Sequence, residues 1–197
     1  MLLLKICGIT RAQDAAAAEA VGADFIGMIF VPESPRRIDL ETARGVVAAA
    51  PRCRSVCVVR NLPLADLRRL IAELRPDVVQ LHGAEPPEYA RAVTGVEVWK
   101  AVKLDSAEVL AEALDFPAAM IVADSGGGTG RPCRWDFAER LARHRPTMLA
   151  GGLNPGNLRM AIDAVHPAGV DLSSGVESAP GIKDYDKLQQ TAERIRE

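Results

Sequence analysis

The sequence reads LLLKICGIT over residues 2–10, a short apolar run that contains a lysine and a cysteine and ends in a glycine turn. Because successive side chains of a β-strand point to opposite faces, Lys5 and Cys7 share one face, and Leu2, Leu4 and Ile6 share the other. A nearby ammonium favours the thiolate, so Cys7 is expected to ionise below the ordinary thiol pKa of about 8.5 and to act as a base or nucleophile. The alternative is a small buried hydrophobic residue, the usual role of a free cysteine.

Outward from this strand, the sequence alternates apolar runs with helical stretches. Thr10 and Gln13 fit a capping box, and the alanine-rich helix that follows ends at Gly22. Further strands are predicted at residues 24–30, 54–60, 77–82, 96–102, 118–124, 146–150 and 169–173. Further helices are predicted at residues 40–50, 64–74, 87–93, 107–114, 135–143, 155–164 and 185–196.

Eight strand–helix units of about 25 residues predict an α/β protein with a single (β/α)8 TIM barrel over residues 1–197. Strands buried on both faces explain the near-continuous apolar runs, such as residues 120–123. A doubly wound open sheet is the alternative, but that fold does not require eight regular units.

The composition fits one soluble globular enzyme domain, with 197 residues, 48% hydrophobic and 25% charged. Lysine and arginine number 24 against 26 acidic residues, so no overall positive charge draws the chain to nucleic acid or to an anionic membrane. There is no signal peptide pattern and no 18-residue apolar run. We therefore expect a cytoplasmic protein without nucleic-acid or membrane partners, either a monomer or a homodimer.

The four cysteines, Cys7, Cys53, Cys57 and Cys133, lack the paired spacing of a zinc site, and a reducing compartment disfavours structural disulfides. Cys53 and Cys57 are expected to bracket a strand, which places them too far apart to ligate one metal ion. Both are interpreted as core or surface thiols, and no metal site is predicted.

Polar residues stand where several predicted strands end. They are Cys7, His82, Asp124, Asp171 and Ser173. Each alone has a structural explanation, such as capping a strand or binding loop amides. A closed barrel brings all these ends to one mouth, where burying so many polar groups costs free energy unless partners or a ligand satisfy them.

Glycine-rich segments follow the last three predicted strands: GGGTG at 126–130, GGLNP at 151–155 and SSGVE at 173–177. Glycines let backbone amides approach an oxyanion, and barrel enzymes commonly bind phosphate in the loops after strands seven and eight. Asn154 and Pro155 fit the N-cap and first position of a helix. These segments together favour phosphate binding.

The loop after the second strand carries Arg36 and Arg37, which can reach over the mouth. A guanidinium there suits a carboxylate or an aromatic ring. The alternative is a solvated basic loop.

Several motifs in order along the chain resemble those of phosphoribosylanthranilate isomerase. They are KICGIT (5–10), VQLHG (79–83), DS followed by GGTG (124–130), GGLNP (151–155) and DLSSGVE (171–177). The resemblance implies a barrel enzyme of tryptophan biosynthesis that acts on a small phosphorylated substrate. Its reaction is an Amadori rearrangement of N-(5-phosphoribosyl)anthranilate to 1-(2-carboxyphenylamino)-1-deoxyribulose 5-phosphate, and it uses no cofactor and no metal.

The resemblance also implies roles for individual residues. The thiol that matches Cys7 is the general base, and the carboxyl group that matches Asp124 is the general acid. Arg36 matches the residue held against the anthranilate carboxylate, and the glycine loops match the phosphate cradle. The substrate-binding residues implied are Arg36, His82, Gly128, Gly130, Gly151, Gly152, Asp171, Ser173, Ser174 and Gly175. One departure is Val59-Arg60-Asn61, where the family usually has phenylalanine, valine and asparagine, which changes the expected wall of the anthranilate pocket.

Three other interpretations remain. A related isomerase of histidine biosynthesis, or an enzyme with both activities, is expected to carry aspartate where this chain has Cys7. Indole-glycerol-phosphate synthase is expected to have a longer N-terminal extension. A non-catalytic phosphosugar-binding barrel would keep the glycine loops and lose the acid or the base, whereas both Cys7 and Asp124 are present.

Overall fold

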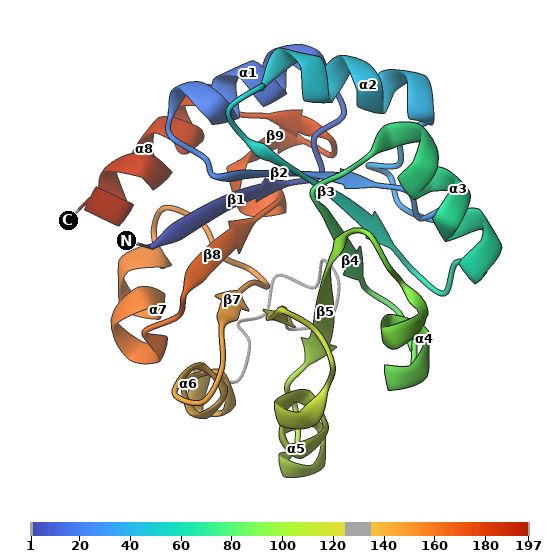
Figure 1. Cartoon of the computed structure of the whole chain (residues 1–197). Coiled ribbons are helices and arrows are strands. Elements are labelled where there is room, and N and C mark those ends of the chain that lie inside the picture. Colours follow the sequence, from blue (N-terminus) through green and yellow to red (C-terminus); the bar gives the residue numbers. More distant parts are fainter. Residues whose placement is uncertain (1, 125–134, 197) are drawn as a thin grey trace.

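The computed structural model describes residues 2–124 and 135–196, and these residues form one closed barrel. Eight parallel strands follow each other around the barrel in sequence order, and the helices lie outside them (Figure 1). The first strand pairs with both the second and the eighth. This closure confirms the predicted (β/α)8 barrel and excludes the open doubly wound sheet.

The bounds of the elements are close to those predicted. The strands of the barrel are β1 (Leu3–Cys7), β2 (Phe25–Ile29), β3 (Arg54–Val59), β4 (Val78–Leu81), β5 (Glu97–Lys103), β6 (Met120–Asp124), β7 (Thr147–Leu149) and β8 (Gly169–Leu172). The helices are α1 (Ala12–Ala20), α2 (Leu40–Ala49), α3 (Leu64–Leu74), α4 (Pro87–Ala92), α5 (Ala107–Asp115), α6 (Trp135–Ala142), α7 (Leu158–Val165) and α8 (Tyr185–Arg196). None of the helices in the described ranges is both long and apolar enough to cross a membrane.

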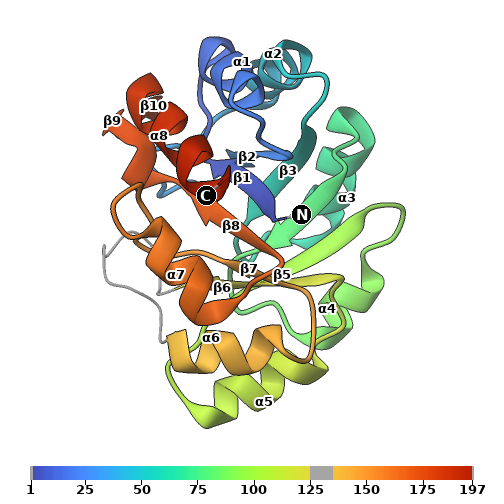
Figure 2. The same cartoon turned by 90° about the vertical axis from the view of Figure 1, so that its left-hand side faces the viewer.

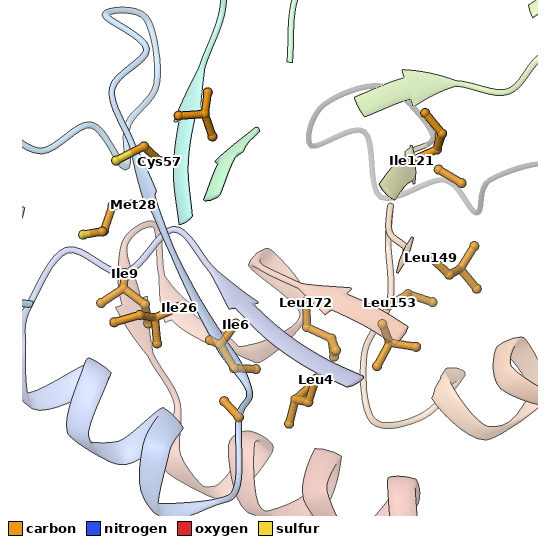
Figure 3. Close-up of a cluster of buried hydrophobic side chains, with 14 of the residues drawn as sticks. Leu4, Ile6, Ile9, Ile26, Met28, Cys57, Ile121, Leu149, Leu153 and Leu172 are labelled. Carbon is orange, nitrogen blue, oxygen red and sulfur yellow. The ribbon is translucent and has the colours of Figure 1, made fainter. Parts of the chain in front are cut away.

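The strands bury both of their faces, which is why their sequences are almost continuously apolar. Leu4 and Ile6 of β1 lie with Ile26 of β2 in the layer between the strands and the helices (Figure 3). On the other face of β1, Cys7 belongs to the cluster inside the barrel, where Trp99 is fully buried. The predicted division of β1 into two faces is therefore confirmed.

A small hairpin follows the eighth strand, and the sequence did not suggest it. It consists of a short 3-10 turn (Ser174–Val176), β9 (Glu177–Ala179) and β10 (Ile182–Lys183), which pairs antiparallel with β9. Gly181 has a φ of +79°, a conformation that glycine adopts without strain, and it joins the two strands. Figure 2 shows the hairpin beside α8.

Two predicted helix caps are wrong. Helix α1 begins after Arg11, not after Thr10, and the Thr10 hydroxyl donates to the carbonyl of Gly181 at 2.5 Å. The tertiary contact with the hairpin takes the hydroxyl that the capping box would have used.

Helix α7 begins at Leu158, after Asn157, rather than after Asn154. The Asn154 side chain instead accepts from the amide of Gly156 at 2.9 Å. This turn places Pro155 before the helix, because the asparagine offers its own local hydrogen bond to the backbone.

Candidate active site

A cavity of about 310 Å³ lies at the carboxyl ends of the barrel strands. Its lining residues are Cys7, Ile29, Val31, Glu33, Ser34, Pro35, Arg36, Val58, Arg60, Gln80, His82, Asp124, Ala150, Gly151, Gly152, Leu153, Asp171, Ser173 and Ser174. The structure thus brings the described part of the predicted site together, with one exception, Gly175, which does not line the cavity. Gly128, Gly130 and Cys133 lie outside the described residues.

The thiol of Cys7 has room inside the barrel because its neighbour on β2 is a glycine. Cys7 and Gly27 are partners in the parallel register. A Cβ atom on Gly27 would lie 2.7 Å from the sulfur, closer than a real Cβ contact allows. Gly27 therefore fixes the space that the thiol occupies.

Cys7 is not activated in the way its neighbour Lys5 suggested. Burial raises the pKa of the thiol, Lys5 acts in the opposite direction, and the net pKa lies above the ordinary value. Lys5 is fully buried and donates its ammonium to Asp171 Oδ2 at 2.7 Å. The predicted lowering of the pKa is therefore wrong, because desolvation outweighs an ammonium whose charge is shared with a carboxylate.

Asp171 lines the cavity and pairs with the buried Lys5. One of its oxygens accepts from Lys5, and the other, Oδ1, is buried without a hydrogen-bond partner among the described residues. A buried acceptor that lines a cavity is satisfied by a ligand or by water. Asp171 thus lies at the cavity, and its role in substrate binding stays a prediction.

His82 lies beside Asp124 at the mouth, with 3.5 Å between Nε2 and Oδ2. Burial lowers the pKa of the imidazole, and the charge of Asp124 only partly offsets this. Gln80 Nε2 lies 3.1 Å from Nδ1, so a neutral His82 accepts there and carries its proton on Nε2, toward Asp124. We assign this tautomer from the hydrogen bond with the amide group.

Gln80 was missed in the sequence, although it carried a signal. It is the one polar residue of β4, Val78–Leu81, and it is only 1% exposed. A buried amide inside an apolar strand needs partners, and here it orients the histidine at the mouth.

Arg36 reaches over the cavity as predicted, but it is already paired. Its Nε and Nη2 atoms donate to the two oxygens of Glu177 at 2.8 and 2.6 Å. Gly8, with a φ of +73°, lets the arginine pass, because a Cβ atom there would lie 2.5 Å from Arg36 Cδ. Glu177 is the last residue of the DLSSGVE motif (171–177), but no role was predicted for it from the sequence.

The two loops expected to bind phosphate meet backbone to backbone. A Cβ atom on Gly175 would overlap the carbonyl oxygen of Leu153, so only glycine permits this contact. Gly151 and Gly152 both have positive φ, at +83° and +68°, and line the cavity with Ser173 and Ser174. Backbone amides and hydroxyls at this side are suited to the oxygens of a phosphate.

The remaining described cysteines lie in the interior. Burial raises the pKa of Cys53 to about 11 and that of Cys57 to about 12. Cys57 packs in the outer core (Figure 3), and Cys53 Sγ lies 3.0 Å from the carbonyl oxygen of Ala23. Within the described ranges, no group of three or more histidine, cysteine or acidic residues could hold a metal ion.

Comparison with known proteins identifies the family. The model of the N-(5'-phosphoribosyl)anthranilate isomerase family matches residues 4–194. The chain belongs to the N-(5'-phosphoribosyl)anthranilate isomerase family. The isomerase of Geobacter metallireducens is 40% identical over 202 residues, which cover 100% of both chains.

Solved structures of the family agree in fold. The phosphoribosyl anthranilate isomerase of Thermus thermophilus has 41% identity and a TM-score of 0.92, over 99% of this chain and 98% of that one. Another family structure, with 35% identity and a TM-score of 0.90 over 100% and 99% of the two chains, is a complex with reduced 1-(o-carboxyphenylamino)-1-deoxyribulose 5-phosphate. Membership in the isomerase family of tryptophan biosynthesis confirms the resemblance drawn from the motifs. It sets aside the synthase and the isomerase dedicated to histidine biosynthesis.

Proposed function

We propose that this chain converts N-(5-phosphoribosyl)anthranilate to 1-(2-carboxyphenylamino)-1-deoxyribulose 5-phosphate, with Asp124 as general acid and Cys7 as general base. The observation that carries this proposal is that Cys7, from the end of β1, and Asp124, from the end of β6, line the same cavity. Two groups on separate strands can act on different atoms of one bound sugar.

The first step is ring opening. The Asp124 carboxyl group gives a proton to the ring oxygen of the ribose, the C1′–O bond breaks, and the anilino nitrogen forms an iminium ion with C1′. The Nε2–H group of the neutral His82 points toward Asp124, so it can donate to the carboxylate that remains after this proton transfer.

The second step is removal of the C2′ proton by the Cys7 thiolate, which gives an enolamine that tautomerises to the ketone. The iminium ion is a positive charge close to the sulfur at the moment when the thiolate is needed, and such a charge favours ionisation of the buried thiol. Substrate and product are isomers, so no electron acceptor is consumed, and the absence of a cofactor stays a prediction.

The two ends of the substrate match the two sides of the cavity. Arg36 is suited to the anthranilate carboxylate, and the loops that contain Gly151, Gly152 and Ser174 are suited to the phosphate. The remaining phosphate contacts predicted at Gly128 and Gly130 stay predictions. So do the cytoplasmic location and the choice between monomer and homodimer.

A direct assay tests the assignment. Freshly generated phosphoribosylanthranilate is mixed with the purified protein, and loss of anthranilate fluorescence is followed for the wild type, Cys7→Ala, Asp124→Ala and the control Cys53→Ser. We expect each of the first two variants to lower kcat by at least about 10²-fold, the scale of general acid–base catalysis. Affinity for the reduced product should change little.

Near-normal turnover in either variant shows that the role given to that residue is wrong. A wild-type protein that binds the reduced product but never consumes the substrate would instead be a non-catalytic phosphosugar-binding barrel.

A further inference from the structure

A chain of three charged side chains links the mouth of the cavity to the barrel seam. Arg36 pairs with Glu177, and Glu177 Oε1 also accepts from Lys183 Nζ at 2.9 Å. Lys183 and Glu177 are both buried, at 3% and 8% exposure, while Arg36 lines the cavity. The catalytic steps proposed above use neither Glu177 nor Lys183.

Lys183 is anchored to the strand ends that carry the site. Its ammonium donates to the carbonyl of Cys7 at 2.6 Å and to the carbonyl of Ser173 at 3.2 Å. Its backbone amide donates to Asp14 of α1 at 3.3 Å. The hairpin that carries Lys183 is thus fixed to both β1 and α1.

Glu177 is held in turn by several donors. Besides Lys183, the amide of Gly181 donates to its Oε1 at 3.3 Å. Burial opposes ionisation of Glu177, but the bonds from Arg36 and Lys183 outweigh it and keep its pKa below the ordinary value. The carboxylate is therefore a fixed, ionised acceptor.

Arg36 receives its orientation from that acceptor. Within the described residues, Glu177 takes Nε and Nη2 in a two-point pair, and Nη1 has no acceptor, so it can donate to a ligand. Gly8 leaves space for the aliphatic part of the side chain. A long side chain held at two points loses little freedom when it binds a carboxylate.

We propose, on the basis of the function proposed above, that Glu177, anchored by Lys183, is a positioning residue that holds the Arg36 guanidinium where the substrate carboxylate binds. By holding Arg36 in place, Glu177 increases the preference of the site for an aromatic amine that carries the ortho carboxylate over one that lacks it. Glu177 does not touch the reacting atoms.

The test compares two ligands on a set of variants. One ligand is reduced 1-(o-carboxyphenylamino)-1-deoxyribulose 5-phosphate, and the other is the same compound without its carboxylate. The ratio of their dissociation constants measures the contribution of the carboxylate alone. Loss of this ratio, with the affinity for the second ligand unchanged, is a readout that a merely structural role would not move.

We expect Arg36→Met to abolish the ratio and Glu177→Gln to reduce it by about 10-fold, because an unpositioned arginine must be ordered on binding. Glu177→Asp retains the charge but is one methylene shorter, and it should also reduce the ratio. Glu85→Gln is the matched control, since Glu85 forms a buried pair with Lys100 at the same 2.9 Å distance and should leave the ratio unchanged.

The outcomes separate the two levels of inference. A ratio lost in Arg36→Met but kept in both Glu177 variants overturns the positioning role and leaves the role of Arg36 intact. A ratio kept in Arg36→Met overturns the carboxylate contact itself. Equal loss of affinity for both ligands in the Glu177 variants also overturns the proposal, since it means that the whole site is disturbed. Tighter binding of the carboxylate ligand to Glu177→Gln overturns it as well, since Glu177 would then only reduce the positive charge of Arg36.

Discussion

Two buried glutamate–lysine pairs lie on opposite sides of the barrel, and they differ in what they hold. Glu177–Lys183 lies by the ends of β1 and β8, and Glu85–Lys100 lies by β4 and β5, across the barrel in the strand order. Each pair is separated by 2.9 Å, and both glutamates have a pKa below the ordinary value because their hydrogen bonds outweigh the effect of burial.

The third partners of the two pairs are different. Glu177 continues to Arg36, a side chain that lines the cavity. Glu85 accepts instead from two loop amides, those of Asn61 at 2.6 Å and Gly83 at 2.9 Å. The first pair is therefore joined to a side chain at the cavity, which we propose binds the substrate, and the second fixes the shape of two loops. The comparison teaches that the role of a buried ion pair follows from its further partner.

Removal of the two lysines should separate stability from binding. Lys100→Met leaves Glu85 without a cation among its described partners and should lower the free energy of unfolding by about 3–5 kcal/mol. Lys183→Met should lower the free energy of unfolding by less than this, because Arg36 still neutralises the charge of Glu177. Urea unfolding measures the effect on stability, and KM of the folded variants measures the effect on substrate binding.

We expect the order to be reversed for KM, with Lys183→Met the more affected variant. If Lys100→Met raises KM as much as Lys183→Met does, the two pairs do not differ in role and the comparison fails.

Gly27→Ala tests the position of the Cys7 thiol, which lies on the same side of the barrel as the Glu177–Lys183 pair. The new methyl group would lie 2.7 Å from Cys7 Sγ and displace the thiol, so kcat should fall by about 10- to 100-fold. Gly45→Ala in α2 is the control, because its Cβ atom meets nothing within 4 Å, and it should stabilise the protein by about 0.5–1 kcal/mol. Steady-state kinetics and thermal unfolding of both variants check these expectations. Unchanged kcat in Gly27→Ala would falsify the assigned position of the thiol.

The pH dependence of kcat/KM examines the Lys5–Asp171 pair. In the proposed mechanism the thiolate is the active form of Cys7. Because the pKa of the thiol is raised, kcat/KM should increase with pH into the region above the ordinary thiol pKa. Lys5→Met combined with Asp171→Asn removes an ammonium that lowers this pKa more than Asp171 raises it. The ascending limb should therefore move to higher pH. A limb that stays in place excludes Lys5 as an influence on the base.

Cys53→Ser should have the smallest effect. Its sulfur lies next to the carbonyl of Ala23, where a serine hydroxyl can also donate, and Cys53 does not line the cavity. We expect kcat within about twofold of the wild type and a change in unfolding free energy of about 0.5 kcal/mol or less. A specific loss of turnover contradicts the interpretation of Cys53 as a core thiol.

Strand periodicity predicted the fold and the gathering of polar residues at the mouth. Alternation along β1 placed Cys7 inside the barrel, and closure in sequence order brought His82, Asp124 and Asp171 to the same cavity. Both results depend on local pattern and on the regular order of parallel units, which a sequence contains.

Interactions between distant residues could not be predicted in the same way. The Thr10 hydroxyl left its expected helix cap for a carbonyl 171 positions away, and Arg36 found its partner 141 positions away. The direction of the Cys7 pKa depends on burial and on how the charge of Lys5 is shared, which are properties of the packed barrel. The placement of Lys5 and Cys7 on one face of the strand, taken alone, predicted a lowered thiol pKa, whereas the pKa is raised.

The bond from Lys183 to the Cys7 carbonyl spans 176 positions of the chain. Cys7 is therefore synthesised well before the side chain that binds its backbone carbonyl. The cavity cannot reach its final geometry on the ribosome until the chain has passed the eighth strand, because Lys183 lies in β10, after that strand.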